Sequence, residues 1–357
     1  MLHREYKKSE QGFSLLEVLV ALVVMMVVTG AIFALMRDSM KTSKAALEMS
    51  DGQQSVRTAH EYINRDLINV GDGLNSINNI RVPVGFVTNY LTLNPVTDPS
   101  TPGFVNLALL TSDNNVLPNT PVRGTLPAAN VRSTPLLTDR ISILQMERPE
   151  IFTPITLAAG AITPATGFAA VSSADINRFA VGEIYFIQSG VGGIFVTITD
   201  RQAVGSATPF LVFGAGDAYG LNSAAQLNVI TAGATLPVSI CRMKIIHYYV
   251  NDNGLLMRRV FGVRNAGFNE SVIAEHAVSL QFRYFLNLRD TAGNVAQPEA
   301  QLTTSAQQVE TRQVEVTVTT ETPHTLENGQ RQQITMTTST SVRNMQFRRT
   351  LQPTAGG

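Results

Sequence analysis

The sequence predicts an α+β protein in which one long N-terminal helix packs on an antiparallel β-sheet that carries an inserted all-β subdomain. Three observations support this fold class. Apolar residues run from Phe13 to Met36 and then recur with a helical spacing as far as Val70. The last third of the chain alternates apolar and polar residues, as strands with one buried face do, and the region between shows no strong helical period. We call the residues after Val70 the head.

The composition limits the function classes. Lys and Arg together number 27, as do Asp and Glu, so the formal net charge is zero. This neutrality argues against a dedicated nucleic-acid binder, whose domain would be clearly basic. Because Cys241 is the single cysteine, no disulfide can form within the chain.

The first element is an apolar segment that follows a short polar leader, residues 1–12. No formal charge occurs among the 19 residues from Val18 to Met36. As a helix this stretch is roughly 28 Å long, close to the hydrocarbon thickness of a bilayer. The basic residues that precede it favour a cytoplasmic leader and a head on the other side of the membrane. We therefore expect a transmembrane helix over 13–36.

Two other interpretations of this apolar segment, a cleaved secretory signal and a plain signal anchor, agree less well with the sequence. A cleaved secretory signal would need a small-x-small site after the apolar run, and residues 29–31 (TGA) lie inside it. A plain signal anchor leaves Glu17 unexplained, because an ionisable residue at membrane depth is costly and usually functional.

Residues 12–18 read GFSLLEV, which resembles the cleavage and methylation motif of type IV pilin-like proteins. The resemblance implies that a prepilin peptidase cuts after Gly12 and methylates the new amino group of Phe13. It also implies that Glu17 pairs with the N-terminal ammonium of a neighbouring subunit during assembly. A charge held among apolar helices needs such a counter-charge.

The helix is expected to continue over 37–70 as an amphipathic segment suited to packing on a sheet. Its apolar face is formed by Met36, Met40, Leu47, Val56, Ala59, Ile63, Leu67 and Val70. Gly52 should weaken it locally, by roughly 1 kcal/mol relative to alanine. The glycines at 71 and 73 predict the end of the helix.

The middle of the chain divides into two parts. Residues 71–138 are rich in proline, threonine and asparagine, and predict a loop-rich connection with short strands at Gly85–Leu93 and Phe104–Leu110. Residues 139–240 predict the inserted β-rich subdomain, with strands at Arg140–Met146, Val181–Gln188, Gly193–Thr199 and Pro209–Phe213.

Residues 241–349 predict the antiparallel sheet of the head, followed by a flexible tail over 350–357. Met243–Val250 and Leu255–Phe261 flank an Asn-Gly turn and predict a hairpin. Further strands are expected at Val278–Leu288, Arg312–Thr320 and Gln332–Arg343. This third resembles PilW-like minor pilins and J-type minor pseudopilins in residues 248–250, 278–284 and 340–345, although the chain is long for that group, mainly because of residues 71–240.

No catalytic or cofactor site is expected. The histidines at 3, 60, 247, 276 and 324 show no metal-ligand spacing. The glycines of 214–220 suit a turn better than a phosphate loop, and Asp72 with Asn75, Asn78 and Asn79 suits a polar loop better than a calcium site. Cys241 is expected to be a buried apolar side chain. Arg343, Arg348 and Arg349 are expected to be solvated, with contact to DNA or an acidic partner as the alternative.

The sequence therefore predicts a non-enzymatic minor pilin, a subunit for the assembly, tip or priming of a type IV pilus-like filament. The resemblance implies other pilin or pseudopilin subunits, prepilin peptidase and an inner-membrane assembly platform as partners. It also implies a single-pass inner-membrane protein with a periplasmic head, which later enters a pilus or pseudopilus. A minor pseudopilin of a type II secretion system, and a tip adhesin or DNA-uptake module that binds through residues 71–240, are the alternatives.

Overall fold

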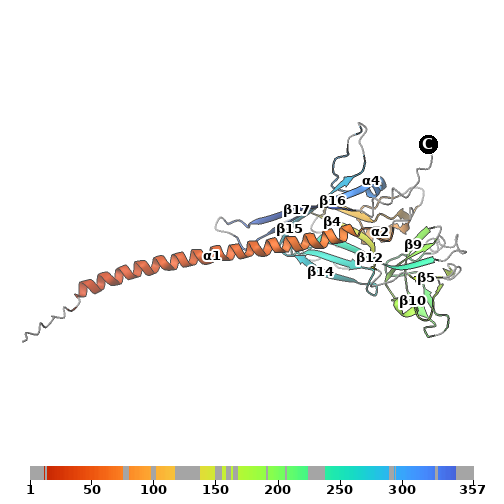
Figure 1. The fold of residues 1–357 in the computed structure, drawn as a ribbon, viewed down its shortest axis with the longest axis horizontal. Coiled ribbons are helices and arrows are strands. Elements are labelled where there is room, and N and C mark those ends of the chain that lie inside the picture. Colours follow the sequence, from red (N-terminus) through yellow and green to blue (C-terminus); the bar gives the residue numbers. More distant parts are fainter. Residues whose placement is uncertain are drawn as a thin grey trace, which may run out of the picture.

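The computed structural model describes residues 12, 14–74, 80–97, 102–116, 137–148, 155–157, 162–163, 168–189, 192–205, 207–223, 238–288, 293, 295–325 and 329–342. One helix, α1 (Leu15–Ile68), forms a stalk that enters a β-rich head (Figure 1). Strands in the described part pair almost entirely antiparallel. The predicted α+β class is confirmed.

Helix α1 has 54 residues and is therefore about 80 Å long. It ends at Ile68, two residues before the predicted end, where Gly71 adopts a left-handed φ of 71°. The predicted packing face is confirmed over its second half, where Val56, Ala59 and Ile63 are buried. The prediction is wrong for the first half of this face, because Met40 and Leu47 are exposed and the head begins beyond them.

A three-stranded sheet covers one side of α1. It has the order β15 (Ala277–Leu286), β16 (Thr311–Glu321) and β17 (Gln333–Ser341), and both pairs are antiparallel. The predicted alternation is confirmed, since the valines at 314, 316 and 318 are fully buried. Helix α1 packs on β16 and β17 and also contacts β14, so it lies between the two sheets of the head.

The second sheet has eight strands. Its main path is β14 (Phe268–Ala274), β13 (Leu256–Phe261), β12 (Val238–Val250), β4 (Thr138–Met146) and β3 (Leu110–Val116). The predicted β12–β13 hairpin is confirmed, and Gly254 in its turn has a φ of 74° that suits glycine. A bridge of backbone hydrogen bonds from Tyr284 to Glu299 extends the other sheet beyond β15.

Strand β12 joins the main core to a second, distal core. Its last residues pair with β4 and β13, whereas Val238–Arg242 pair with β5 (Ile155–Leu157) and β8 (Ile184–Ser189). Strand β8 then pairs with β9 (Gly192–Thr197). A four-stranded sheet lies beside them, in the order β10 (Asp200–Gln202), β11 (Phe210–Val212), β7 (Phe168–Ala170) and β6 (Ile162–Thr163).

The distal core lies at the end of the head farthest from the stalk (Figure 1). It differs from the expected insertion at its start, because β4 belongs to the main sheet through its pairing with β3 and β12. The short helix η1 (Ile176–Arg178) closes one side of this core with the buried Ile176.

Several local predictions differ from the structure. Gly85–Leu93 was expected to be a strand but forms helix α2 (Val84–Tyr90), which follows Pro83 and buries Phe86 and Tyr90 one turn apart. The expected strand at 104–110 is split between β2 (Phe104–Asn106), paired with β1 (Arg81–Pro83), and the start of β3. Helix α4 (Ser305–Glu310) and strand β14 were not predicted, although Thr304 and Gln307 form a capping box.

Candidate assembly segment and its junction with the head

The N-terminal end of α1 is open to its surroundings. The backbone of Ser14 is extended, and its carbonyl accepts hydrogen bonds from the backbone N–H of Glu17 at 2.9 Å and of Val18 at 3.2 Å. Gly12 and Glu17 are exposed. Phe13, the expected methylation site, lies outside the described residues. The predicted cut site therefore adjoins the first helical turn.

Glu17 stands in that first turn, where the partial positive charge of the helix dipole favours a carboxylate. No charged residue follows it before Arg37. Among the described residues, its local electrostatic support is the helix terminus, and a cation from another chain would be strongly attracted in an apolar environment.

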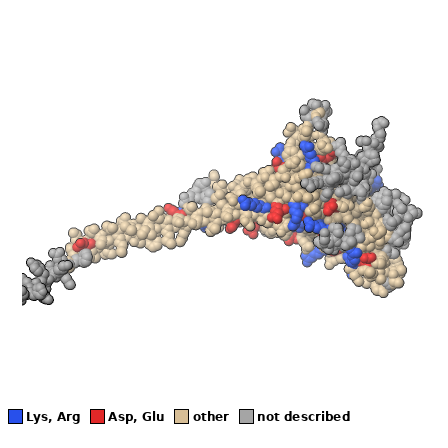
Figure 2. All heavy atoms as spheres, in the orientation of Figure 1, with Lys and Arg blue, Asp and Glu red and all other residues tan. Residues whose placement is uncertain are grey.

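The stalk carries apolar side chains on all sides. Exposure is 83% at Leu15, 66% at Phe33 and 59% at Met40, and the 18-residue window of highest hydropathy has no buried residue. Charged atoms are scarce on the visible face of the stalk and gather where it enters the head (Figure 2). By length and composition, α1 is able to cross a membrane.

Polar contacts fix the last turns of α1 to the head. The His60 ring lies 3.0 Å from the Met336 carbonyl oxygen and 2.7 Å from Thr338 Oγ1, and Thr340 Oγ1 donates to Asn64 Oδ1 at 2.6 Å. Burial lowers the pKa of His60 below its ordinary value, because water no longer solvates the charged ring. A neutral ring at this position bridges α1 to β17.

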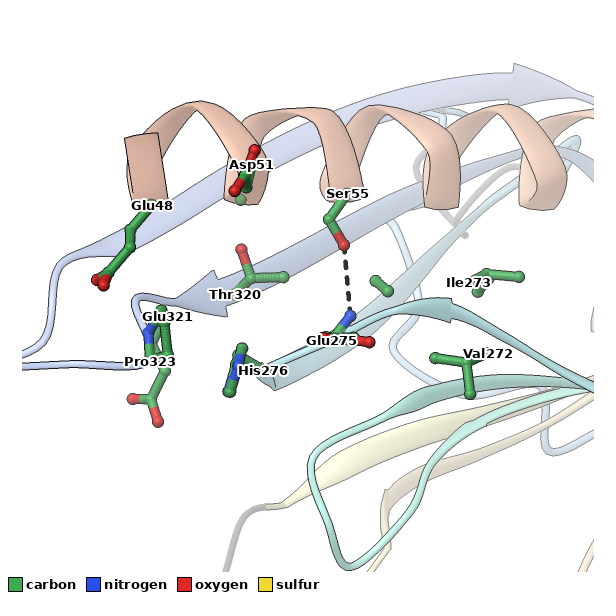
Figure 3. Close-up of a pocket in the computed structure, with 12 residues that line it drawn as sticks. Glu48, Asp51, Ser55, Val272, Ile273, Glu275, His276, Thr320, Glu321 and Pro323 are labelled. Atoms are coloured by element: carbon green, nitrogen blue, oxygen red, sulfur yellow. Dashed lines mark hydrogen bonds between the residues drawn. The ribbon is translucent and has the colours of Figure 1, made fainter. Parts of the chain in front are cut away.

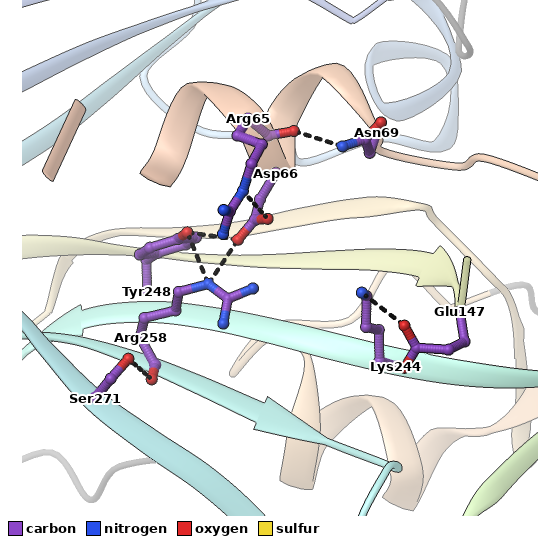
Figure 4. Close-up of polar contacts among 8 residues, drawn as sticks. All are labelled: Arg65, Asp66, Asn69, Glu147, Lys244, Tyr248, Arg258 and Ser271. Carbon is purple, nitrogen blue, oxygen red and sulfur yellow. Dashed lines mark hydrogen bonds and ion pairs between the residues drawn. The ribbon is translucent and has the colours of Figure 1, made fainter. Parts of the chain in front are cut away.

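Asp66 makes the strongest polar contact between the helix and the eight-stranded sheet (Figure 4). Its Oδ2 accepts from the Tyr248 hydroxyl at 2.6 Å and from Arg258 Nε at 2.7 Å. Burial and the adjacent Asp66 carboxylate raise the pKa of Tyr248 well above its ordinary value. The sequence held one signal for this site, since Asp66 falls beside Leu67 and Ile63 on the packing face, where a polar residue needs a partner.

The remaining candidate residues form no reactive cluster. Cys241 is buried, as expected, and burial raises the pKa of its thiol. Within the described residues, no three His, Cys, Asp or Glu side chains are placed to hold a metal ion. His3, Asn75, Asn78, Asn79, Arg343, Arg348 and Arg349 lie outside the described residues.

The glycine-rich loop at 214–220 is a turn organised by Asp217. Its carboxylate accepts backbone N–H groups of Tyr219 at 3.2 Å, Leu221 at 3.0 Å and Asn222 at 2.8 Å. These are the donors that a phosphate would need, and an acidic residue already occupies them. The turn interpretation is confirmed.

Comparison with known proteins places the N-terminal segment in a class. The family model of the prokaryotic N-terminal methylation motif matches residues 7–33. Together with the long apolar helix, this match fits a type IV pilin-like protein of the prepilin type, as the resemblance at residues 12–18 indicated. No curated protein and no solved structure matches the chain.

Proposed function

We propose that this chain is a minor subunit of a type IV pilus-like filament, cut after Gly12 by a prepilin peptidase and methylated at Phe13. The apolar part of α1 holds the subunit in the inner membrane with the head in the periplasm, until it enters the filament. Its work is assembly through other pilin subunits and the inner-membrane platform. No chemical reaction is assigned to it.

One observation carries this proposal. The methylation motif at residues 7–33 leads directly into a helix that is bare over its first half and interlocked with the head over its last turns. A bare apolar helix is stable only in lipid or among other apolar helices. The same helix thus supports membrane anchoring first and packing in a filament afterwards.

Glu17 is proposed to set the register between subunits. After cleavage it becomes the fifth residue of the mature chain, and its proposed partner is the N-terminal ammonium of an adjacent subunit. Two opposite charges in an apolar bundle attract strongly, whereas either charge alone is costly there.

The size and placement of the head favour a tip or priming position over the filament shaft. The distal core lies beyond the main sheets along the direction of the stalk (Figure 1), so it extends the molecule away from the membrane. A tip position also suits the alternative of a binding module on this distal part. A shaft subunit would be found evenly along purified filaments, and that result would contradict the tip position.

Intact mass and N-terminal analysis of the protein from its native membrane test the proposal. The expected product begins with N-methylated Phe13 and lacks residues 1–12. A Gly12→Ala variant should stay uncut and serves as the matched control, because an added Cβ at residue 12 meets no other atom within 4 Å. An intact Met1 on the wild-type protein would contradict the processing step.

A further inference from the structure

A pocket of about 440 Å³ opens where the stalk meets the head (Figure 3). Glu48, Asp51 and Ser55 of α1 form one wall, and the turn after β14 forms another with Glu275 and His276. The end of β16 contributes Thr320 and Glu321. Four of the lining residues are acidic and none is Lys or Arg.

A buried hydroxyl at the pocket lacks a partner. Thr320 is 1% exposed, and its Oγ1 has no hydrogen-bond partner in the described part of the chain. The oxygen points across the pocket toward α1 (Figure 3). Because a buried hydroxyl without a partner costs free energy, the pocket is built for an occupant that carries a hydrogen-bonding group.

The charged side chains around the pocket indicate which kind of hydrogen-bonding group would bind there. Glu48 already contacts His324 Nδ1 at 2.7 Å and Lys44 Nζ at 3.9 Å, and Glu321 pairs with Arg331 at 2.5 Å. Asp51 and Glu275 have no cation within 4.0 Å among the described residues. Two uncompensated carboxylates beside an unpaired hydroxyl fit an ammonium or guanidinium group, which only donates hydrogen bonds.

The chain itself presents such groups farther down the stalk. Arg37, Lys41 and Lys44 follow one another at spacings of four and three, so they lie on one helix face, and they surround a shallow hollow with Phe33, Met36 and Met40. At about 1.5 Å per residue, the centre of this basic face is about 13 Å nearer the membrane than Glu48 and Asp51. A second copy in the same orientation, shifted outward by that distance, brings its basic face level with the pocket.

We propose that the pocket receives the basic face, Arg37, Lys41 and Lys44, of a second copy of this chain. The inference rests on the proposed function, because a common membrane anchor gives both copies the same orientation. The contact joins different surfaces of the two copies, so a pair leaves one pocket and one basic face open at its two ends. It adds a polar contact at the stalk–head junction to the packing of the apolar helices.

A zero-length carbodiimide cross-link tests the contact on native residues. Full-length protein is produced as a mixture of nitrogen-15-labelled and unlabelled copies in cells that assemble filaments, and the filaments are cross-linked and digested. We expect mixed-isotope peptides that join Lys41 to Asp51 or Glu275. The Lys44–Glu48 pair, 3.9 Å apart within one chain, is the internal positive control.

Variants separate the contact from accidental proximity. Asp51→Asn with Glu275→Gln removes the reactive carboxylates, so its effect is measured by co-purification of the labelled and unlabelled copies, which should fall. Asp38→Asn, an exposed change on the same helix outside the pocket, should leave both co-purification and the mixed peptides. Lys41→Glu in every copy should lose co-purification, and adding Asp51→Lys in every copy should restore it. Restoration by opposite charges would not follow from a general loss of folding.

Three results would overturn the inference. Mixed peptides that are absent from the wild-type protein, or co-purification that is unchanged in the Asp51→Asn, Glu275→Gln variant, exclude the pocket as the contact. A Lys41→Glu variant that loses bound lipid while its co-purification with other subunits is unchanged would assign the basic face to anionic lipid headgroups instead. The same mass data report the N-terminus, so a chain processed to Phe13 without mixed peptides refutes this inference and leaves the proposed function standing.

Discussion

Asp66 is the carboxylate on which the union of stalk and head most depends. Its side chain is 5% exposed, and it is held by Tyr248 and Arg258 at a separation of more than 180 residues in sequence. Removing one partner of a buried pair leaves the other charge desolvated and uncompensated. The Arg258 guanidinium would be left in that state.

Asp66→Ala should therefore lower the free energy of unfolding by roughly 3–5 kcal/mol. Asp38→Ala is the matched control on the same helix, since Asp38 is 69% exposed and pairs with Lys41 at 3.8 Å. Its loss should cost less than about 1 kcal/mol. Denaturant unfolding of the full-length protein in detergent, followed by a head-specific signal, measures both, and equal effects would contradict the buried-pair argument.

Asp139 gives the head a defined response to pH. Its two oxygens accept the backbone N–H of Asn115 at 3.0 Å and of Phe282 at 2.8 Å, so it ties β4 to β15. Burial raises its pKa to about 6, although both N–H groups oppose the shift. Its folded pKa exceeds its unfolded pKa of 3.8, so its contribution to stability is complete below 3.8 and is lost as the pH rises through 6.

The head should then gain a few kcal/mol of stability from this residue as the pH falls from 7 to 4, at about 1.4 kcal/mol per pKa unit. Asp139→Asn should remove that part of the pH dependence and lower stability throughout, because an amide offers one acceptor oxygen in place of two. The unfolding midpoints of the wild-type and Asp139→Asn proteins, measured at several pH values, test this prediction. A pH profile that is the same in both proteins would assign the titration to another group.

At the scale of elements, Gly52 of α1 lies against Ile334 of β17. A Cβ built there would lie 2.6 Å from Ile334 Cδ1, so the glycine creates room for that isoleucine. The sequence suggested only a weak point in the helix at this position. The structure adds the reason, since the bare backbone lets the helix and the strand pack closely.

Gly52→Ala alone should change stability little, because a gain of about 1 kcal/mol in helix propensity is offset by the displaced Ile334. Adding Ile334→Val removes the contacting methyl and should make the double variant more stable than Gly52→Ala. Ile334→Val alone is the control and should be slightly destabilising, by about 1 kcal/mol. Additive effects in the thermal unfolding of the four proteins would show that the two residues do not interact.

Elements with strong local periods were predictable, and those defined by distant contacts were not. Helix α1 and strands β15 and β16 follow apolar spacings that are visible within each segment's own sequence. Helix α2 contains Gly85, Val87 and Thr88, which favour strands or turns, and it is helical because its apolar face packs in the core. Strand β14 (FNESVIA) carries no alternation because most of it lies exposed at a sheet edge.

The candidate site divides in the same way. Gly12, Phe13 and Glu17 belong to a motif that is read within seven residues of sequence. Asp66 lies on α1, and its partners lie on strands more than 180 residues later. The pocket with the four acidic residues likewise has one wall on α1 and the others on segments more than 180 residues later. Only the folded arrangement brings them together, as it also assigns β4 to the main sheet through its pairing with β12.

In the proposed function, the whole molecule separates anchoring by the stalk from display of the head. The first half of the stalk offers apolar side chains in every direction, whereas the two hydrophobic cores and the polar contacts that fix the stalk lie at the head. Because α1 belongs to both parts, a displacement of the stalk within a membrane or filament moves the head with it. In the proposed function, assembly therefore depends on the stalk, and its one acidic residue between Gly12 and Arg37 is Glu17.

Glu17→Gln tests this dependence. The change keeps the shape of the side chain and the apolar run, so membrane insertion and processing after Gly12 should persist. The N-terminal ammonium of a neighbouring subunit would lose its counter-charge, and an unpaired charge among apolar helices costs on the order of 3 kcal/mol or more. Recovery of the subunit in sheared filaments, relative to its amount in the membrane, should then fall at least about tenfold. Glu17→Asp retains the charge on a shorter side chain and should recover part of the incorporation. Unchanged incorporation of a processed Glu17→Gln subunit would show that other residues set the register between subunits. The acidic residues of the pocket at the stalk–head junction would then be the next to substitute.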